Sequence, residues 1–402
     1  MDARPAPAVQ KIETADSRAT WFNRNVAAMC LASLLSDLGH EMATSILPLF
    51  LTAIGASPSA LGIIEGASDG AATFAKLIGG RIADRKGLRQ KVASLGYLVT
   101  GLATGSFAAA MTWFELLIAR TVGWFGRGTR GPSRDNLLVD SVPRARVGAA
   151  LGLHRTADTL GAILGPLTAM FLLHRIGFRN IFLVSLVPGA LAAAAFYFFV
   201  REPDGSNTAQ APEFKGWDAA LPSSFRTFLA TILLFGIGDF AHSMLVLRAA
   251  QLLGSTPKAM RIAIGLYVIH NTAHAALSYP IGVIGDRVER RRLLAVAYVI
   301  AAVAAAGFAI GPHSVGALVV LFILEGAVMA AQETLDSAVA TDLLPADSRG
   351  AGFGVMNATS GVGDFVSSMA VGFLWSGVSG HAAFAYSAVL SFAAAGLMAW
   401  AI

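Results

Sequence analysis

Twelve apolar runs, each long enough to cross a lipid bilayer as a helix, constrain this sequence more than any other feature. A helix needs roughly 20 mostly apolar residues to span the hydrocarbon layer. The predicted spans are 25–53, 60–82, 92–110, 114–138, 148–173, 180–200, 226–249, 261–283, 293–311, 315–340, 351–375 and 381–402. The first run contains Asp37, His40 and Glu41, which favours a retained helix over a cleaved signal peptide. The sequence therefore predicts an all-α membrane protein with twelve transmembrane helices.

The composition excludes the main classes of soluble protein. Only 14% of the residues are charged and 55% are apolar, whereas an average soluble protein is about 25% charged. The basic residues lie in short clusters between apolar runs, so we expect no nucleic-acid partner. The single cysteine, Cys30, excludes a disulfide framework and a paired-cysteine redox site. Because the sequence has no phosphate-binding loop and no HExxH motif, we expect no enzymatic activity and no cofactor.

Lysine and arginine residues are divided unequally between the two sets of loops. Four of them, Arg175, Arg179, Lys258 and Arg261, lie in loops on the side away from the amino terminus. Twelve lie on the side of the amino terminus: Arg81, Arg85, Lys86, Arg89, Lys91, Arg144, Arg146, Arg287, Arg290, Arg291, Arg292 and Arg349. Since basic loops remain in the cytoplasm, both termini are expected there. The arginine-, alanine- and glycine-rich composition indicates a bacterial source, and we expect a multi-pass protein of the inner membrane.

The two parts of the chain repeat each other. Asp84 follows Asp37 by 47 residues, Asp286 follows Asp239 by the same interval, and the offset between the two pairs is 202. The predicted division is a cytoplasmic tail at 1–24, a six-helix half at 25–200, a cytoplasmic linker at 201–225 and a second six-helix half at 226–402. Two six-helix repeats in parallel orientation are typical of secondary transporters.

Three motifs resemble those of one family. The loop after the second span reads GRIADRKGLR from Gly80, and its repeat copy reads GVIGDRVERR from Gly282. The first copy resembles the G-x-L-A-D-R-x-G-R-R/K loop of the major facilitator superfamily. RTVGWFG from Arg120 is similar to the R-x-x-x-G-x-G pattern of that family, with imperfect spacing. GAILGP from Gly161 is similar to the G-x-x-x-G-P element of the proton-coupled antiporter branch.

The resemblance implies two six-helix halves that rock around a site at mid-membrane. It implies a gating role for the two loops, and Asp84 is expected to latch onto the start of the eleventh helix near Gly350. The alternative is that the loops only anchor the topology. The gating candidates are Gly80, Asp84, Arg85, Gly87, Asp286 and Arg287. Gly161 and Gly165, followed by Pro166, allow close helix packing, and the alternative is packing with no meaning for antiport.

Ionisable residues gather at the middle of the spans, and they are called here the polar belt. Such residues are costly inside a membrane and indicate function by default. They are Asp37, His40, Glu41, Asp69, Asp158, Asp239, His242, His270, His274, Glu325 and Asp364. We expect Asp158, Glu325 and Asp364 to contact the substrate together with the belt histidines and Glu41.

Arginines at seven-residue intervals on the fourth span provide counter-charges for these acids. Arg120, Arg127 and Arg134 form one stripe, which either binds an anionic substrate or, as we favour, neutralises buried carboxylates. A carboxylate beside an arginine stays ionised and can take up a proton when the arginine moves away. Asp37 with Arg120 is the predicted coupling pair, and Asp69 and Asp239 are the next candidates.

The histidines suggest what the substrate is. His270 and His274, at i and i+4, share a helix face, where imidazoles beside carboxylates can hold a transition metal. His40 and Glu41 are the candidate completing ligands. The alternatives are a proton relay, contact with a polar substrate and hydrogen-bonded packing.

These features together predict a secondary transporter that works by alternating access. We expect proton-coupled export of a small solute, with iron, nickel or cobalt ions as the leading substrate. Drug or metabolite efflux and organic-anion uptake are the alternatives. An embedded enzyme and a transport-inactive sensor are the rivals from other classes. The expected partners are the lipid bilayer, protons and the solute, and we expect a monomer.

Overall fold

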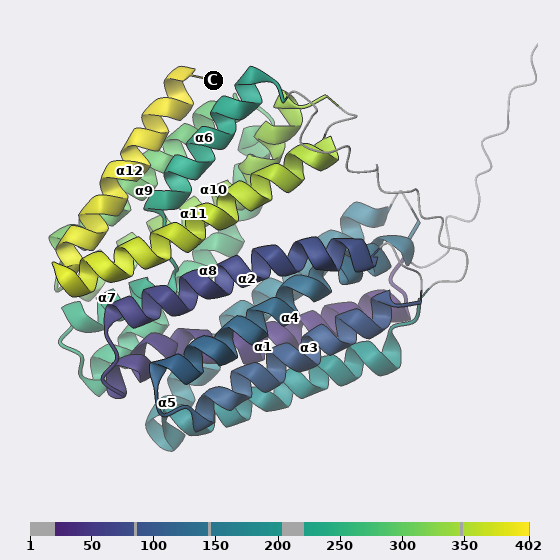
Figure 1. Cartoon of the computed structure of the whole chain (residues 1–402), viewed down its shortest axis with the longest axis horizontal. Coiled ribbons are helices and arrows are strands. Elements are labelled where there is room, and N and C mark those ends of the chain that lie inside the picture. Colours follow the sequence, from purple (N-terminus) through teal and green to yellow (C-terminus); the bar gives the residue numbers. More distant parts are fainter. Residues whose placement is uncertain (1–20, 84–86, 144–145, 203–220, 346–348, 402) are drawn as a thin grey trace, which may run out of the picture.

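The computed structural model describes residues 21–83, 87–143, 146–202, 221–345 and 349–401, and it contains helices but no strand within them. Figure 1 shows their arrangement. The helices are α1 Arg24–Ala53, α2 Pro58–Ala83, α3 Arg89–Ser106, a short 3₁₀ turn Phe107–Ala109, α4 Trp113–Asp140, α5 Val147–Phe199, α6 Ser223–Gly238, α7 Ser243–Leu252, α8 Pro257–Gly285, α9 Arg290–Ile310, α10 Val315–Leu343, α11 Arg349–Gly377 and α12 Gly380–Ala401.

The predicted twelve-span, all-α fold is confirmed, although the fifth, sixth and seventh spans are not single separate helices. The fifth and sixth spans both lie in α5, which turns back at Gly177, where φ is +73°. Glycine has no Cβ and adopts this left-handed conformation without strain. The seventh span is broken into α6 and α7 at residues 239–242.

Six helices among the described residues are long and apolar enough to cross a membrane by length and composition alone. They are Arg89–Ala109, Val147–Phe199, Ser223–Leu252, Arg290–Ile310, Val315–Leu343 and Gly380–Trp400. The other long helices include α1, α2 and α4, which carry several charged residues within their spans, among them Asp37, Asp69 and Arg120. Polar side chains of this kind are tolerated at membrane depth where they face the interior of a bundle.

The helices form two bundles that meet at one end of the molecule. The first bundle holds α1 to α5, and the second holds α6 to α12 (Figure 1). The bundles touch through α2 against α11, α5 against α8, and α1 against α7 and α8. The end at which the described chain begins and ends is called here the terminal end, and the other is called the opposite end.

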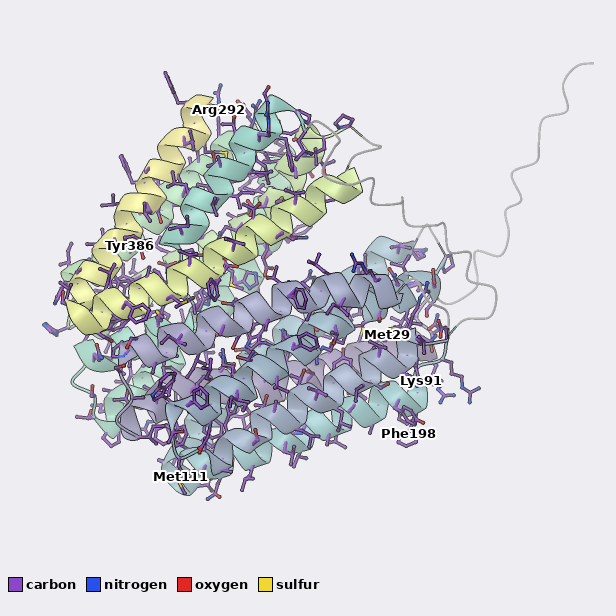
Figure 2. All side chains as sticks on the ribbon, viewed as in Figure 1. Met29, Lys91, Met111, Phe198, Arg292 and Tyr386 are labelled. Carbon is purple, nitrogen blue, oxygen red and sulfur yellow. The ribbon has the colours of Figure 1, made fainter. Side chains whose placement is uncertain are left out.

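Three apolar clusters show which end is closed. The largest cluster lies at the opposite end and combines both bundles, including Phe50 and Leu61 of the first with Leu245 and Phe308 of the second. At the terminal end each bundle has a separate cluster, one around Phe196 and one around Phe228 in the second bundle. In Figure 2, Lys91 of the first bundle and Arg292 of the second, both at the terminal end, lie far apart. The halves are therefore packed together at the opposite end and separated at the terminal end.

Candidate functional site

Two ion pairs, one buried and one partly buried, connect α4 to its neighbours. Arg120 donates to the Glu65 carboxylate of α2 from Nη2 at 2.6 Å and from Nε at 2.9 Å. Arg127 donates to the Asp37 carboxylate of α1 from Nη1 at 2.8 Å and from Nη2 at 3.4 Å. Trp124 lies between them, with the two guanidinium carbons 5.8 and 5.6 Å from its ring centroid. Arg120 and Arg127 of the arginine stripe therefore each neutralise a buried carboxylate.

The predicted pairing of Asp37 with Arg120 is wrong. Arg127 occupies that place, and Arg130 Nη2 lies 3.9 Å from the same carboxylate. Seven residues span about two helical turns, or about 11 Å along the axis. Arg120 is therefore at the depth of Glu65, and Arg127 is at the depth of Asp37. Arg134, the third member of the stripe, pairs with its neighbour Asp135 at 3.0 Å.

Glu65 also joins the two halves. Ser243, at the start of α7, donates a hydrogen bond from Oγ to Glu65 Oε1 at 2.6 Å. Arg120 reaches Thr44 Oγ1 at 3.4 Å, and Thr44 is hydrogen-bonded to His40 Nε2 at the same distance. His40 on α1 is thus linked through Arg120 and Glu65 to α7 in the other half.

Glu41 forms a second polar contact between the halves. The Tyr267 hydroxyl of α8 donates to Glu41 Oε2 at 3.1 Å. The Tyr267 ring is stacked on His270, and the His270 ring lies 4.7 Å from that of His242, centroid to centroid. His270 Nδ1 donates to Asn271 Oδ1 at 3.1 Å, and the Asn271 Nδ2 donates to the Ala162 carbonyl of α5 at 2.8 Å. His270 Nε2 is buried with no partner among the described residues.

His270 and His274 share a helix face but have different partners. His274 Nε2 lies 3.1 Å from the Glu333 carboxylate of α10, and the Glu333 side chain is 51% exposed. His154 faces α1 instead, 2.6 Å from Ser33 Oγ, with Asp158 3.5 Å from its other ring nitrogen. Among the described residues no group of three or more His, Cys, Asp and Glu side chains is placed to hold a metal ion. His40, Glu41, His270 and His274 therefore do not come together as a metal site in this arrangement.

The remaining belt acids lie in and beside the second half. Asp239 lies at the break between α6 and α7, where its carboxylate accepts from the Phe240 amide at 2.9 Å. Its carboxylate lies close enough to those of Glu325 on α10 and Asp364 on α11 for the charges to interact. Asp364 in turn neighbours Asp69 of α2 across the contact between the halves. A broken helix at mid-membrane that carries acidic residues is typical of transporter sites.

Gly161 and Gly165 let α5 press directly on the acidic face of α1. A Cβ at Gly161 would lie 2.5 Å from the Leu34 carbonyl and 3.0 Å from the Asp37 Cβ. A Cβ at Gly165 would lie 2.6 Å from the Leu38 carbonyl and 2.9 Å from the Glu41 Cβ. Only glycine allows this approach, so the two positions set where Asp37 and Glu41 stand relative to α5. Pro166 follows within the same buried stretch.

The comparison with known proteins identifies the family. The model of the Major Facilitator Superfamily matches residues 29–266 and 228–402. The chain belongs to the major facilitator superfamily. It is 28% identical over 374 residues to an uncharacterised transporter of this type from Methanocaldococcus jannaschii, covering 92% of this chain and 93% of the relative. The multidrug resistance protein MdtG of Salmonella arizonae is 25% identical over 291 residues, covering 69% and 71%.

The same superfamily contains the structural neighbours. A bacterial homologue of the human lysosomal transporter Spinster, solved in an inward-facing and occupied conformation, matches with a TM-score of 0.76. The match is 15% identical in sequence and covers 94% of this chain and 96% of the other. At that identity the likeness concerns the fold alone. Family and fold are those of multi-pass membrane transporters.

The predicted latch of this superfamily lies partly outside the described residues. Asp84 and Arg85 are not described, nor are the side chains at the start of α11. Gly80 has open space around it, and Gly87 has a φ of +80°, which suits glycine. In the second copy, Asp286 pairs with Arg290 at 3.0 Å, and Arg290 also binds Asp342 at 2.9 Å. Arg287, the residue after Asp286, is exposed just beyond the end of α8.

Four residues of this site were not among the coupling or substrate-contact candidates predicted from the sequence. Glu65 shares a helix face with Asp69 and Arg127 lies in the arginine stripe, so both were within reach of the spacing argument. Ser243 and Tyr267 carry no charge, and nothing in their local pattern separates them from other polar residues in spans. Their importance comes from contacts with Glu65 and Glu41 in the other half.

Proposed function

We propose that this protein exports a small organic solute in exchange for protons, with Asp37 and Arg127 as the coupling pair. The observation that carries the proposal is the Asp37–Arg127 pair itself. Its carboxylate is buried, its guanidinium is 29% exposed, and the pair joins two helices that border the separation between the halves. A partly buried ion pair contributes little net stability, which favours a role in the working cycle.

The proposed coupling uses the two protonation states of Asp37. While Arg127 is within 2.8 Å, the carboxylate is held in its charged form. When a solute or a rearrangement of α1 and α4 draws Arg127 away, Asp37 takes up a proton. Because Gly161 of α5 abuts the Asp37 backbone region, rocking of α5 against α1 would alter this pair directly.

Export of an organic compound is supported by the name of one relative and by the donor groups present. MdtG is a multidrug resistance protein, and the polar groups of the belt suit hydrogen bonding to an organic solute. We propose that the solute contacts the His274–Glu333 pair and the exposed side of Arg127. His242, Glu325 and Asp364 are further candidate contacts. With loops oriented as the basic residues predict, the terminal end faces the cytoplasm, so the structure would be open inward.

The test is transport by purified protein in liposomes under an imposed pH gradient. The probes are the cation ethidium, zwitterionic tetracycline and anionic novobiocin. Gradient-driven movement of at least one probe is expected, and Asp37→Asn should abolish it in a folded protein. The matched control is Asp135→Asn, which removes a half-exposed carboxylate from α4 that, within the described part of the chain, forms an ion pair with its neighbour Arg134 alone.

Each failure has a separate meaning. If no probe moves, the organic-solute class is wrong. If a probe moves without regard to the gradient, proton coupling is wrong. If Asp37→Asn retains full gradient-driven transport, the coupling carboxylate lies elsewhere, and Asp69 and Asp239 are next.

A further inference from the structure

An apolar groove at the opposite end lies between the two halves on the outer surface of the molecule. Its volume is about 430 Å³. The first half contributes Met170 and Phe171 of α5, and the second contributes Ile262 and Leu266 of α8 with Val319 of α10. Gly265 leaves the floor open, since a Cβ there would make only ordinary contact with the Met170 sulfur at 3.4 Å.

Two nitrogen-bearing side chains stand at the mouth of this groove, one from each half. His174 comes from the end of the first span of α5, and Arg261 comes from the first turns of α8. Both are exposed, and among the described residues neither has an acidic partner within ion-pair distance. Arg175 and Lys258, also exposed, are near them in sequence. Four basic residues were predicted in loops on the side away from the amino terminus. Three of them, Arg175, Lys258 and Arg261, thus belong to these two helix ends.

Acidic groups that could neutralise this charge are scarce at the opposite end. Glu115 of α4 is the acid in the turns there, and it already accepts hydrogen bonds from the Met111 and Thr112 amides as a helix cap. Figure 2 shows Met111 at this end of the first half. The charge at the mouth is therefore available to an anion from outside the chain.

We propose that the groove binds an anionic phospholipid of the surrounding leaflet, with its phosphate between His174 and Arg261 and one acyl chain along Gly265. The apolar lining suits an acyl chain, and the length from Arg261 to Ile269 is about 12 Å along α8. Arginine suits the headgroup because its planar fork of donors matches phosphate oxygens. Basic pockets between transmembrane helices bind lipid headgroups in this way.

Such a lipid would act on the transport cycle because it touches both halves. It would be held best when α5 and α8 are close at the opposite end, as they are here. A ligand shifts a conformational equilibrium only by its difference in affinity for the two states. Anionic lipid should therefore favour the state that is closed at the opposite end.

The binding test is native mass spectrometry of the whole protein in mild detergent with equal amounts of phosphatidylglycerol and phosphatidylcholine of matched acyl chains. The parent protein should retain phosphatidylglycerol preferentially. Arg261→Gln should lower that retention about fivefold and bring it near the level of phosphatidylcholine. Gly265→Phe, which fills the groove, should reduce retention of both lipids. Lys258→Gln, an equal change of charge on the same helix outside the groove, should leave both unchanged.

The outcomes decide between a specific site and diffuse attraction. Equal retention of the two lipids by the parent, or parent-like retention by both groove variants, would overturn the proposal. A loss in Lys258→Gln as large as in Arg261→Gln would also overturn it, since the charge alone would then suffice. Because Arg261 is exposed, its replacement tests binding even if Gly265→Phe fails to fold.

The effect on conformation is measured with spin labels at Ala53→Cys and Val378→Cys, in a chain in which Cys30 is replaced by serine. Both label positions are exposed at the opposite end. Phosphatidylglycerol should increase the population at short distance relative to phosphatidylcholine in the parent but not in Arg261→Gln. An unchanged distribution would show that the lipid does not bridge the halves.

Discussion

Arg120 and Glu65 form the most completely buried ion pair among the described residues. Both side chains are 3% exposed, and the carboxylate accepts from Arg120 on α4 and from Ser243 on α7. Charges so far from water are tolerated only when each hydrogen-bonding group finds a partner. The pair therefore depends on contacts from both halves, and removal of one member leaves the other charge without compensation.

Replacement of Glu65 by glutamine should destabilise the protein by about 3–5 kcal/mol, because it leaves Arg120 as an unpaired buried charge. Thermal unfolding in detergent is the measurement. Glu333→Gln is the matched control, since Glu333 is half exposed and pairs only with His274; its cost should stay below about 1 kcal/mol. Similar melting temperatures for the two variants would contradict this account of Glu65.

At the scale of helices, α5 and α1 pack backbone against backbone beside the Asp37–Arg127 pair. The missing side chains of Gly161 and Gly165 bring backbone against backbone, one helical turn apart. Small residues four apart are the usual means by which transmembrane helices pack tightly. In this chain the same contact positions Asp37 and Glu41, so a change in this packing also shifts these two carboxylates.

Gly161→Ala should destabilise the protein by about 1–3 kcal/mol through overpacking and slow gradient-driven transport. Its added methyl group would lie 2.5 Å from the Leu34 carbonyl, so α5 and α1 must move apart. Gly152→Ala on the same helix has open space and should stabilise slightly, by up to about 1 kcal/mol, because alanine favours helix over glycine. Unfolding and transport are measured on both variants. Equal behaviour of Gly161→Ala and Gly152→Ala would contradict a role for the close contact between α5 and α1.

For the whole molecule, the two halves are held together at one end by small residues and a few polar contacts. Gly62 of α2 and Gly372 of α11 meet backbone to backbone, and Ser243 and Tyr267 reach across to Glu65 and Glu41. The merged apolar cluster surrounds these contacts. To open this end, the protein must separate all of them while the terminal end closes.

Gly372→Leu should shift the protein toward the state open at the opposite end, because its side chain would collide with Gly62 and the Pro58 carbonyl. Spin labels at Lys91→Cys and Arg292→Cys, both at the terminal end (Figure 2), should move closer together. Gly354→Leu, on the same helix but in open space, is the control and should keep the parent distance. An unchanged distance in Gly372→Leu would show that this crossing does not limit the motion.

The sequence alone determined the features that depend on local pattern. Span length and hydropathy predicted the twelve crossings, and the break between the fifth and sixth spans falls at Gly177 as their spacing required. The expectation that Asp37, His40, His242 and Glu325 lie at a similar depth came from counting along each span, because a helix rises by a constant amount per residue. The close packing around Gly161 and Gly165 was likewise readable from their spacing.

The tertiary structure decided which of these groups meet. Arg127 rather than Arg120 binds Asp37, because the relative depth of α1 and α4 depends on how the bundle packs and not on either helix alone. Glu65 and Ser243 lie 178 residues apart, and Glu41 and Tyr267 lie 226 apart. No periodicity reaches across such separations. The rotation of each helix and the end at which the halves close are set by side-chain packing between them, so only the folded arrangement contains this information.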